Sequence, residues 1–217
     1  MAPLACPSCG AALPFSTSFA VFAVCAYCGA AVVRRDRDVE SIGVVADLPE
    51  EVSPWQLGAS IAMDGRRYTL AGRVRMAWAD GVWTEWFAAG ANDAVAWLAE
   101  AQGTLAVSVP CPAEQAEGLD PAVPPALNQA VRIRATAYRV VDIKEARCIG
   151  VEGELPFPAP VGRTSTGADM LSRDGGFAGA EYGPEGMRLF VGRYATLAEL
   201  QPRGLRALEG WTAPVFV

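Results

Sequence analysis

Two short repeats, Cys6-Pro7-Ser8-Cys9-Gly10 and Cys25-Ala26-Tyr27-Cys28-Gly29, decide how the N-terminal part of the chain is built. Each Cys-x-x-Cys pair directs two sulfurs to one point, and the glycine that follows permits the backbone conformation that such a loop needs. Two pairs at this spacing are typical of a zinc site, in which four thiolates complete a tetrahedron and leave no position for substrate. We therefore predict a structural Zn²⁺ ion held by Cys6, Cys9, Cys25 and Cys28.

The alternatives to zinc are a pair of disulfides and a redox-active cysteine pair. Disulfides persist in oxidising compartments, whereas the N-terminus shows no basic segment followed by an apolar core that would direct export. A thioredoxin-like pair begins the helix of a βαβ unit, and no such pattern follows either repeat. Zinc is the favoured interpretation, and we expect a cytoplasmic protein.

Composition excludes several classes of function. The 217 residues are 52% hydrophobic, which argues against disorder, and the net charge of −6 argues against a nucleic-acid-binding surface. The chain contains no histidine, so catalytic schemes that depend on imidazole are excluded. The longest apolar run, residues 19–33, is shorter than the roughly 20 residues of a transmembrane helix. We expect no transmembrane segment and no nucleic-acid partner, and leave peripheral membrane association and the oligomeric state open.

The main region has the pattern of antiparallel strands. Residues 61–63 and 68–78 flank Asp64-Gly65, a dipeptide typical of a tight hairpin turn, and residues 82–87 follow a second Asp-Gly at Asp80-Gly81. Further strands are expected at residues 104–109, 131–134, 138–149 and 151–155, and a hairpin at 177–194. Prolines make residues 110–125 and 156–167 loops. Thr196 and Glu199 form a capping box that begins a short helix, which Pro202 ends.

The position of Glu85 depends on the turn at Asp80-Gly81. A two-residue turn pairs Trp78 with Trp83 and places Glu85 on the apolar face, opposite Met76. A three-residue bulged loop pairs Trp78 with Val82 and places Glu85 opposite Arg75 on the polar face. The second arrangement is favoured, because burying an unpaired carboxylate costs several kcal/mol.

The main region is either a pair of similar lobes or one unit, and the internal similarity in its sequence is too weak to decide between these two alternatives. Tyr138 corresponds to Tyr68, Glu154-Leu155 to Glu85-Trp86, and residues 171–177 to residues 98–104. The expected architecture is mainly β, with a four-cysteine zinc ribbon (residues 1–33), a linker (34–54) and an antiparallel β-rich domain (55–217) that ends with a short helix. The two lobes would be residues 55–109 and 127–217.

Several short motifs of residues 55–200 are similar to those of one known family. They are Tyr68 with Gly72-Arg73, Gly81-Val82-Trp83-Thr84-Glu85-Trp86, Trp97-Leu98, Gly153-Glu154-Leu155-Pro156, and Val191-Gly192 with Tyr194. On these residues the main region resembles the bacterial domain of unknown function 4178 family, some members of which carry an N-terminal zinc ribbon. The resemblance implies no assigned activity and transfers no catalytic or cofactor-binding residues.

The sequence is compatible with two functions. The first is a non-enzymatic module that binds a protein partner through the ribbon or through the face that carries Trp83 and Phe87. It is favoured because the predicted metal site is closed and no nucleophile–base pair is visible. The second is a carboxylate-based enzyme, or a protein that binds a small cation or polyamine, in which Glu85 and Glu154 face each other. Asp169 and Glu181 are the other acids in or beside predicted strands. Cys148 is expected in the core and Cys111 as an exposed thiol.

Overall fold

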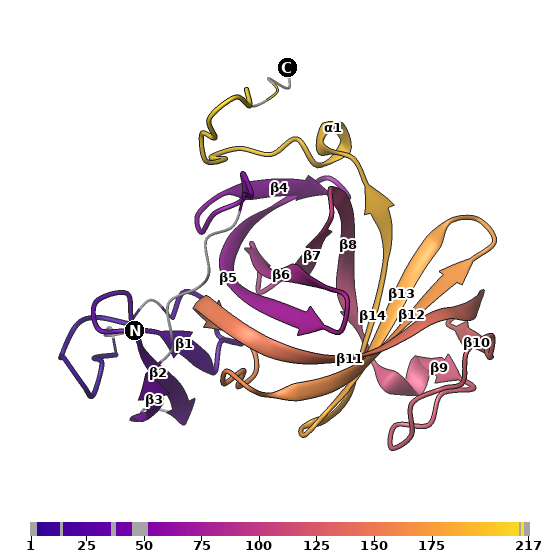
Figure 1. The fold of residues 1–217 in the computed structure, drawn as a ribbon, viewed down its shortest axis with the longest axis horizontal. Coiled ribbons are helices and arrows are strands. Elements are labelled where there is room, and N and C mark those ends of the chain that lie inside the picture. Colours follow the sequence, from indigo (N-terminus) through magenta and orange to yellow (C-terminus); the bar gives the residue numbers. More distant parts are fainter. Residues whose placement is uncertain (1–3, 14, 36–37, 45–51, 213, 215–217) are drawn as a thin grey trace.

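The computed structural model describes residues 4–13, 15–35, 38–44, 52–212 and 214. These residues form an almost entirely antiparallel β structure, which confirms the predicted fold class (Figure 1). The N-terminal strands are β1 (Phe22–Val24), β2 (Ala30–Arg35) and β3 (Asp38–Val44). The main region begins with β4 (Ser60–Met63), β5 (Arg66–Trp78), β6 (Gly81–Gly90), β7 (Val95–Ala101) and β8 (Thr104–Cys111). It continues with η1 (Ala113–Gln115), β9 (Ala116–Glu117), β10 (Ala130–Ile133), β11 (Thr136–Leu155), β12 (Thr164–Ser172), β13 (Gly176–Gly183), β14 (Gly186–Ala195) and the helix α1 (Leu197–Leu200).

Eight long strands close on themselves. Their order is β5-β6-β7-β8-β14-β13-β12-β11, and β11 then pairs with β5 (Figure 1). We call this ring of strands the closed sheet. Among the described residues, no helix has both the length and the apolar character needed to cross a bilayer.

The closed sheet consists of two halves with the same layout. Strands β4–β8 form a short strand, a long strand and three more strands, and β10–β14 repeat this sequence of elements. The halves meet at two seams, where β5 pairs with β11 and β8 pairs with β14, so each seam joins equivalent strands. The two expected lobes are therefore halves of one closed sheet.

Only one of the three sequence correspondences fits these halves. Tyr68 and Tyr138 occupy equivalent places, each paired with a residue of the preceding short strand. The correspondence of Glu85 with Glu154 is wrong, because they lie on the non-equivalent strands β6 and β11. The correspondence of residues 98–104 with 171–177 is also wrong, since Leu98 lies within β7 whereas Leu171 lies near the end of β12. The hairpin turns are too similar in composition to fix the alignment of the halves.

Glycines allow the strands to approach closely at both seams. Gly72 of β5 pairs with Gly153 of β11, and a Cβ added at Gly72 would lie 1.9 Å from the carbonyl oxygen of Glu154. Gly192 of β14 pairs with Ser108 of β8, and a Cβ there would lie 1.8 Å from the carbonyl oxygen of Val107. No side chain fits at either distance.

The turn between β5 and β6 differs from both predicted registers. Trp78 pairs with Gly81, so the turn residues are Ala79 and Asp80. Glu85 consequently lies opposite Val74 rather than Arg75, and its side chain is on the interior face. Two features explain the difference: Gly81 leaves room for the indole of Trp78 beside it, and the interior contains a cavity in which a carboxylate is accommodated.

The N-terminal strands form a small sheet that continues the closed sheet. Phe22 of β1 pairs with Leu155 at the end of β11, and β2 and β3 follow outward. Within the predicted linker, Asp38–Val44 forms the strand β3. This strand is held in place because Val39 packs on the core of the ribbon. Residues 36–37 and 45–51 of that linker lie outside the described residues. The domain boundaries themselves stay a prediction.

The outer faces of the two halves are covered separately. Trp55, Ile61 and Leu200 cover the first half, which places the segment before β4 and the helix α1 on the same core. Val131 and Ile133 of β10 cover the second half. The capping box at Thr196 and Glu199 is present as predicted. With the outer faces covered in this way, the inner face of the closed sheet is left for the candidate binding site.

Candidate metal centre and interior cavity

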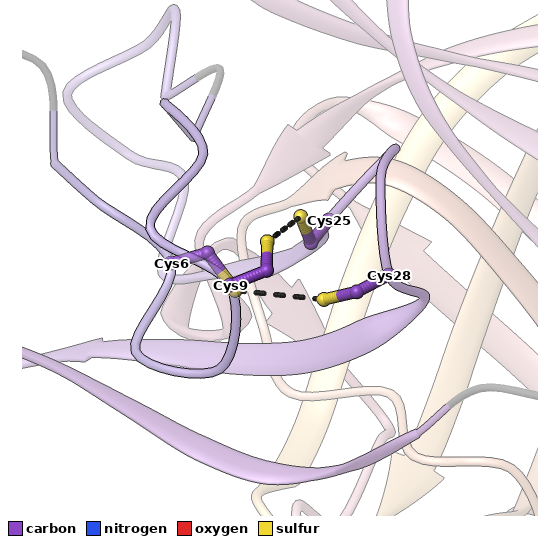
Figure 2. A group of neighbouring side chains, drawn as sticks. All are labelled: Cys6, Cys9, Cys25 and Cys28. Carbon is purple, nitrogen blue, oxygen red and sulfur yellow. Dashed lines mark hydrogen bonds between the residues drawn. The ribbon is translucent and has the colours of Figure 1, made fainter.

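The four cysteines of the two repeats converge on one point (Figure 2). All four sulfurs lie within 4.8 Å of one another, with 3.8 Å between Cys6 Sγ and Cys28 Sγ and 3.6 Å between Cys9 Sγ and Cys25 Sγ. Sulfurs at the corners of a tetrahedron around zinc, at about 2.3 Å from the metal, are about 3.8 Å apart. The four sulfurs therefore have the spacing of a tetrathiolate site, and none of these cysteines forms a disulfide.

Each repeat builds its half of the site in the same way. The backbone N–H of Gly10 donates to the carbonyl of Cys6, and that of Gly29 donates to the carbonyl of Cys25. Both glycines have positive φ, 77° and 68°, which glycine adopts without strain. The cysteine loops are thus held by backbone hydrogen bonds, and a donor set of four thiolates fits a structural metal ion.

The interior of the closed sheet contains a cavity of about 470 Å³. Alternate residues of all eight strands of the closed sheet line it, as expected when one face of each strand points inward. Val82 and Tyr194 line the cavity and are also 44% and 46% exposed, which places its mouth at their end of the sheet. No local sequence pattern predicts the cavity, because the pairing of β5 with β11 that closes the sheet joins residues about 70–80 positions apart, from Ala77 with Arg147 to Gly72 with Gly153.

Aromatic side chains form much of the cavity wall. Trp97 lies at their centre, with ring-centroid distances of 5.7 Å to Phe157 and 6.1 Å to Phe190, and it also packs on Phe87 at 5.5 Å, which does not line the cavity. The surface predicted to bind a partner through Trp83 and Phe87 is therefore not present, because Trp83 lines the cavity and Phe87 is fully buried. The remaining aromatic residues of the wall are Trp78, Phe177 and Tyr194.

A network of ion pairs lies at one side of the cavity. Glu181 accepts hydrogen bonds from Arg163 at 2.7 Å and from Arg188 at 2.5 Å, and Arg163 also donates to Glu185 at 2.6 Å. Burial opposes ionisation of Glu181, but Arg188 and Arg163 hold its pKa below the usual value. Both guanidinium groups also lie over the ring of Phe157. This network is internally compensated, with each arginine bonded to an acid.

Glu85 lies on the cavity wall outside this network. Its carboxylate accepts a hydrogen bond from the indole N–H of Trp83 at 2.9 Å. Burial and the neighbouring negative charges of Glu181 and Asp169 raise the pKa of Glu85 to about 7, against the opposing effects of Trp83 and Arg188. The accessible part of this side chain faces the cavity, so a molecule inside would contact it.

Asp169 also faces the cavity from β12. Burial raises its pKa, although the positive charge of Lys144 partly offsets the effect. Within the described part of the chain, the Asp169 carboxylate forms no hydrogen bond or ion pair, because the amino group of Lys144 contacts Asp142 instead. Asp169 and Glu85 are thus the acids of the cavity without a basic partner.

The structure does not bring Glu154 to the cavity. Its carboxylate is buried at the junction with the ribbon, where Ser16 donates to it from the backbone N–H and from the hydroxyl group. The predicted pairing of Glu85 with Glu154 in one cleft is therefore wrong. Both acids lie in predicted strands, and the order of residues alone does not reveal on which face of a bent strand each one lies.

The two remaining cysteines are both buried. Cys148 lies on β11 and lines the cavity, which agrees with the predicted core position. The prediction that Cys111 is exposed is wrong: it is 6% exposed and its thiol is directed to the carbonyl of Pro112 and the side chain of Gln115. Of the two prolines that suggested a surface loop, Pro110 lies within β8 and Pro112 precedes η1, whose Gln115 contacts the thiol.

Comparison with known proteins identifies the main region. A family model described as a domain of unknown function, DUF4178, matches residues 56–196. This range contains every strand from β4 to β14 and therefore the whole closed sheet and its cavity, whereas the four clustered cysteines lie outside it. No significant match was found among curated proteins or solved structures.

Proposed function

The chain belongs to the DUF4178 family of domains of unknown function, and we propose that it is a binding protein that holds a small molecule inside the closed sheet. The observation that carries this proposal is the aromatic-lined cavity of about 470 Å³ with a mouth at one end. Ligand pockets typically have about 300–1,000 Å³, and closed sheets of eight strands have room for one small ligand.

Binding is favoured over catalysis by the side chains that line the cavity. A nucleophilic enzyme needs a hydroxyl or thiol group hydrogen-bonded to a base. Among the described lining residues, the thiol of Cys148 is directed to the backbone carbonyls of Gly150 and Ala159. Burial raises the pKa of that thiol, which keeps it protonated.

Dye binding tests this proposal. The neutral apolar dye Nile red should gain fluorescence with the wild-type protein, and Ala99→Phe should weaken its binding about tenfold because the added ring occupies the cavity. Ala122→Phe adds the same volume at an exposed loop position and should bind the dye normally. If the wild type does not bind Nile red, or if Ala99→Phe binds it equally well, the cavity is not a ligand site.

We assign a structural role to zinc at the four-cysteine site. The sulfur spacing and the all-thiolate donor set support zinc, which prefers four tetrahedral sulfur ligands when it is structural. Metal analysis of the purified protein, with Cys25→Ser/Cys28→Ser as the matched variant, tests the assignment. One zinc per chain in the wild type and none in the variant is the expected result, and iron or no metal would contradict it.

A protein-binding role for the ribbon is a second candidate. It is supported by Tyr27, a large aromatic side chain between Cys25 and Cys28 that is 83% exposed. In a pull-down from native cytosol, Tyr27→Ala should lose a partner that the wild type retains, while zinc content stays the same. A partner retained equally by Tyr27→Ala would exclude this surface as its docking site.

A further inference from the structure

The charged groups of the cavity do not balance. The lining contains the acids Glu85, Asp142, Asp169 and Glu181 but only the bases Lys144 and Arg163. Arg188 and Glu185, next to this lining, add one charge of each sign through the network with Arg163 and Glu181. The cavity and its immediate surroundings therefore carry two more acids than bases.

The ion pairs identify which acids are in excess. Lys144 contacts Asp142, while Arg163 and Arg188 are bonded to Glu181 and Glu185. Each base at the described cavity is thus already paired with an acid. Glu85, bonded to a neutral indole, and Asp169 remain, and both carboxylates line the same cavity, close enough for the negative charge of Asp169 to act on Glu85.

We propose that the cavity ligand is a hydrophobic amine, whose cation pairs with Glu85 and Asp169 while its apolar part packs on the aromatic wall. This inference rests on the binding function proposed above. A bound cation supplies the positive charge that the two acids lack. Because both partners of such a pair are buried, removing the charge of one partner leaves the other charge unpaired in the interior, and the affinity for the cation falls strongly.

The aromatic wall supports the same class of ligand. Trp78 already contacts a cation inside the closed sheet, since the amino group of Lys144 lies 4.8 Å from the centroid of its ring. Indole rings attract ammonium groups in this way. Trp83 and Trp97 offer further indole surface to the ligand. An anionic ligand would have to displace Glu181 or Asp142 from its basic partner and would face Glu85 without compensation.

Three probes of matched shape test the class of ligand by calorimetry: naphthylethylamine, naphthylethanol and naphthylacetate. They share the aromatic part and differ in charge, positive, neutral and negative. The amine should bind the wild type at least about tenfold more tightly than the alcohol, because a hydrogen bond to a buried charge is worth more than a neutral one. The acetate should bind most weakly.

The variant Glu85→Gln/Asp169→Asn removes both charges while keeping the side-chain volumes. It should bind the amine and the alcohol with similar affinity, and its unchanged affinity for the alcohol shows that the cavity is intact. Glu117→Gln, which removes an exposed charge outside the closed sheet, should keep the preference for the amine.

The outcomes separate this inference from the proposed function. If the alcohol or acetate binds as tightly as the amine, or if the double variant keeps the preference, the ligand is not recognised as an amine, although the cavity remains a binding site. If none of the three probes binds and Nile red does not bind either, the binding function itself is wrong, and the inference with it.

Discussion

Ser16 holds the buried carboxylate of Glu154 with two hydrogen bonds, one from its backbone N–H at 2.9 Å and one from its hydroxyl group. Ser16 lies between the two cysteine repeats, and Glu154 lies near the end of β11 in the closed sheet. Burial raises the pKa of Glu154, and the hydrogen bonds from Ser16 work against that rise. The contact therefore couples the ribbon to the closed sheet.

Ser16→Ala should lower the free energy of unfolding by about 1–3 kcal/mol, because a buried carboxylate loses one of its donors. Urea denaturation followed by tryptophan fluorescence measures the change. Ser18→Ala, which removes an exposed hydrogen bond to Asp93, should change stability by less than about 0.5 kcal/mol. Equal stability of the wild type and Ser16→Ala would show that this contact does not contribute to stability.

Removal of the metal should unfold residues 1–33 and leave residues 55–217 folded. A structural zinc contributes roughly 10–16 kcal/mol to a ribbon of this kind, whereas the closed sheet has its own cores. Hydrogen exchange with and without a chelator measures this. Loss of protection should be confined to the ribbon and to the end of β11 that pairs with β1. Melting of the whole chain in one step would contradict the prediction.

Glu85→Gln should stabilise the protein more at about pH 8 than at about pH 5. The pKa of Glu85 rises from 4.5 to about 7 on folding, so the native state binds this proton more tightly than the unfolded state does. The contribution of Glu85 to stability is therefore favourable at low pH and is lost as the pH rises from about 4.5 through 7.

The difference in unfolding free energy between Glu85→Gln and the wild type should grow by about 1–3 kcal/mol across this range. Urea denaturation at both pH values measures it, with Glu117→Gln as the exposed control. A difference that does not depend on pH would mean that Glu85 titrates normally in the folded protein.

Gly72→Ala and Gly192→Ala should each destabilise the protein by about 2–4 kcal/mol, because the added methyl group overlaps the backbone of the partner strand at a seam. Gly167→Ala is the matched control, since its added methyl group meets nothing closer than 3.9 Å. Thermal unfolding followed by circular dichroism ranks the three variants. A Gly72→Ala protein as stable as Gly167→Ala would contradict the close approach of β5 and β11.

Local patterns predicted the strands well and their partners less well. The Asp64-Gly65 turn, the hairpin of β13 and β14 and the capping box at Thr196 depend on neighbouring residues, and each is present. Closure of the sheet depends on β5 meeting β11, and no local pattern encodes that contact. The four-cysteine cluster was predictable because both repeats carry their own turn glycines.

Glu85 shows why the interior site was harder to predict. The cost of burying a carboxylate favoured the polar face for this residue, yet the structure places it on the interior face. That argument holds for a solid core, whereas here the interior is a cavity and Trp83 donates to the carboxylate. Three of the four acids singled out from the sequence, Glu85, Asp169 and Glu181, do line the cavity.

The equivalence of the two seams has a consequence for assembly at high concentration. Strands β4–β8 of one molecule present to β10–β14 of another the same edges that close the sheet within one chain. The connection between the halves, from Pro112 to Gln129, contains only η1 and the two-residue strand β9. Two chains that exchanged halves through this hinge would keep every backbone hydrogen bond of both seams, so we expect any dimer that forms during refolding at high concentration to be domain-swapped.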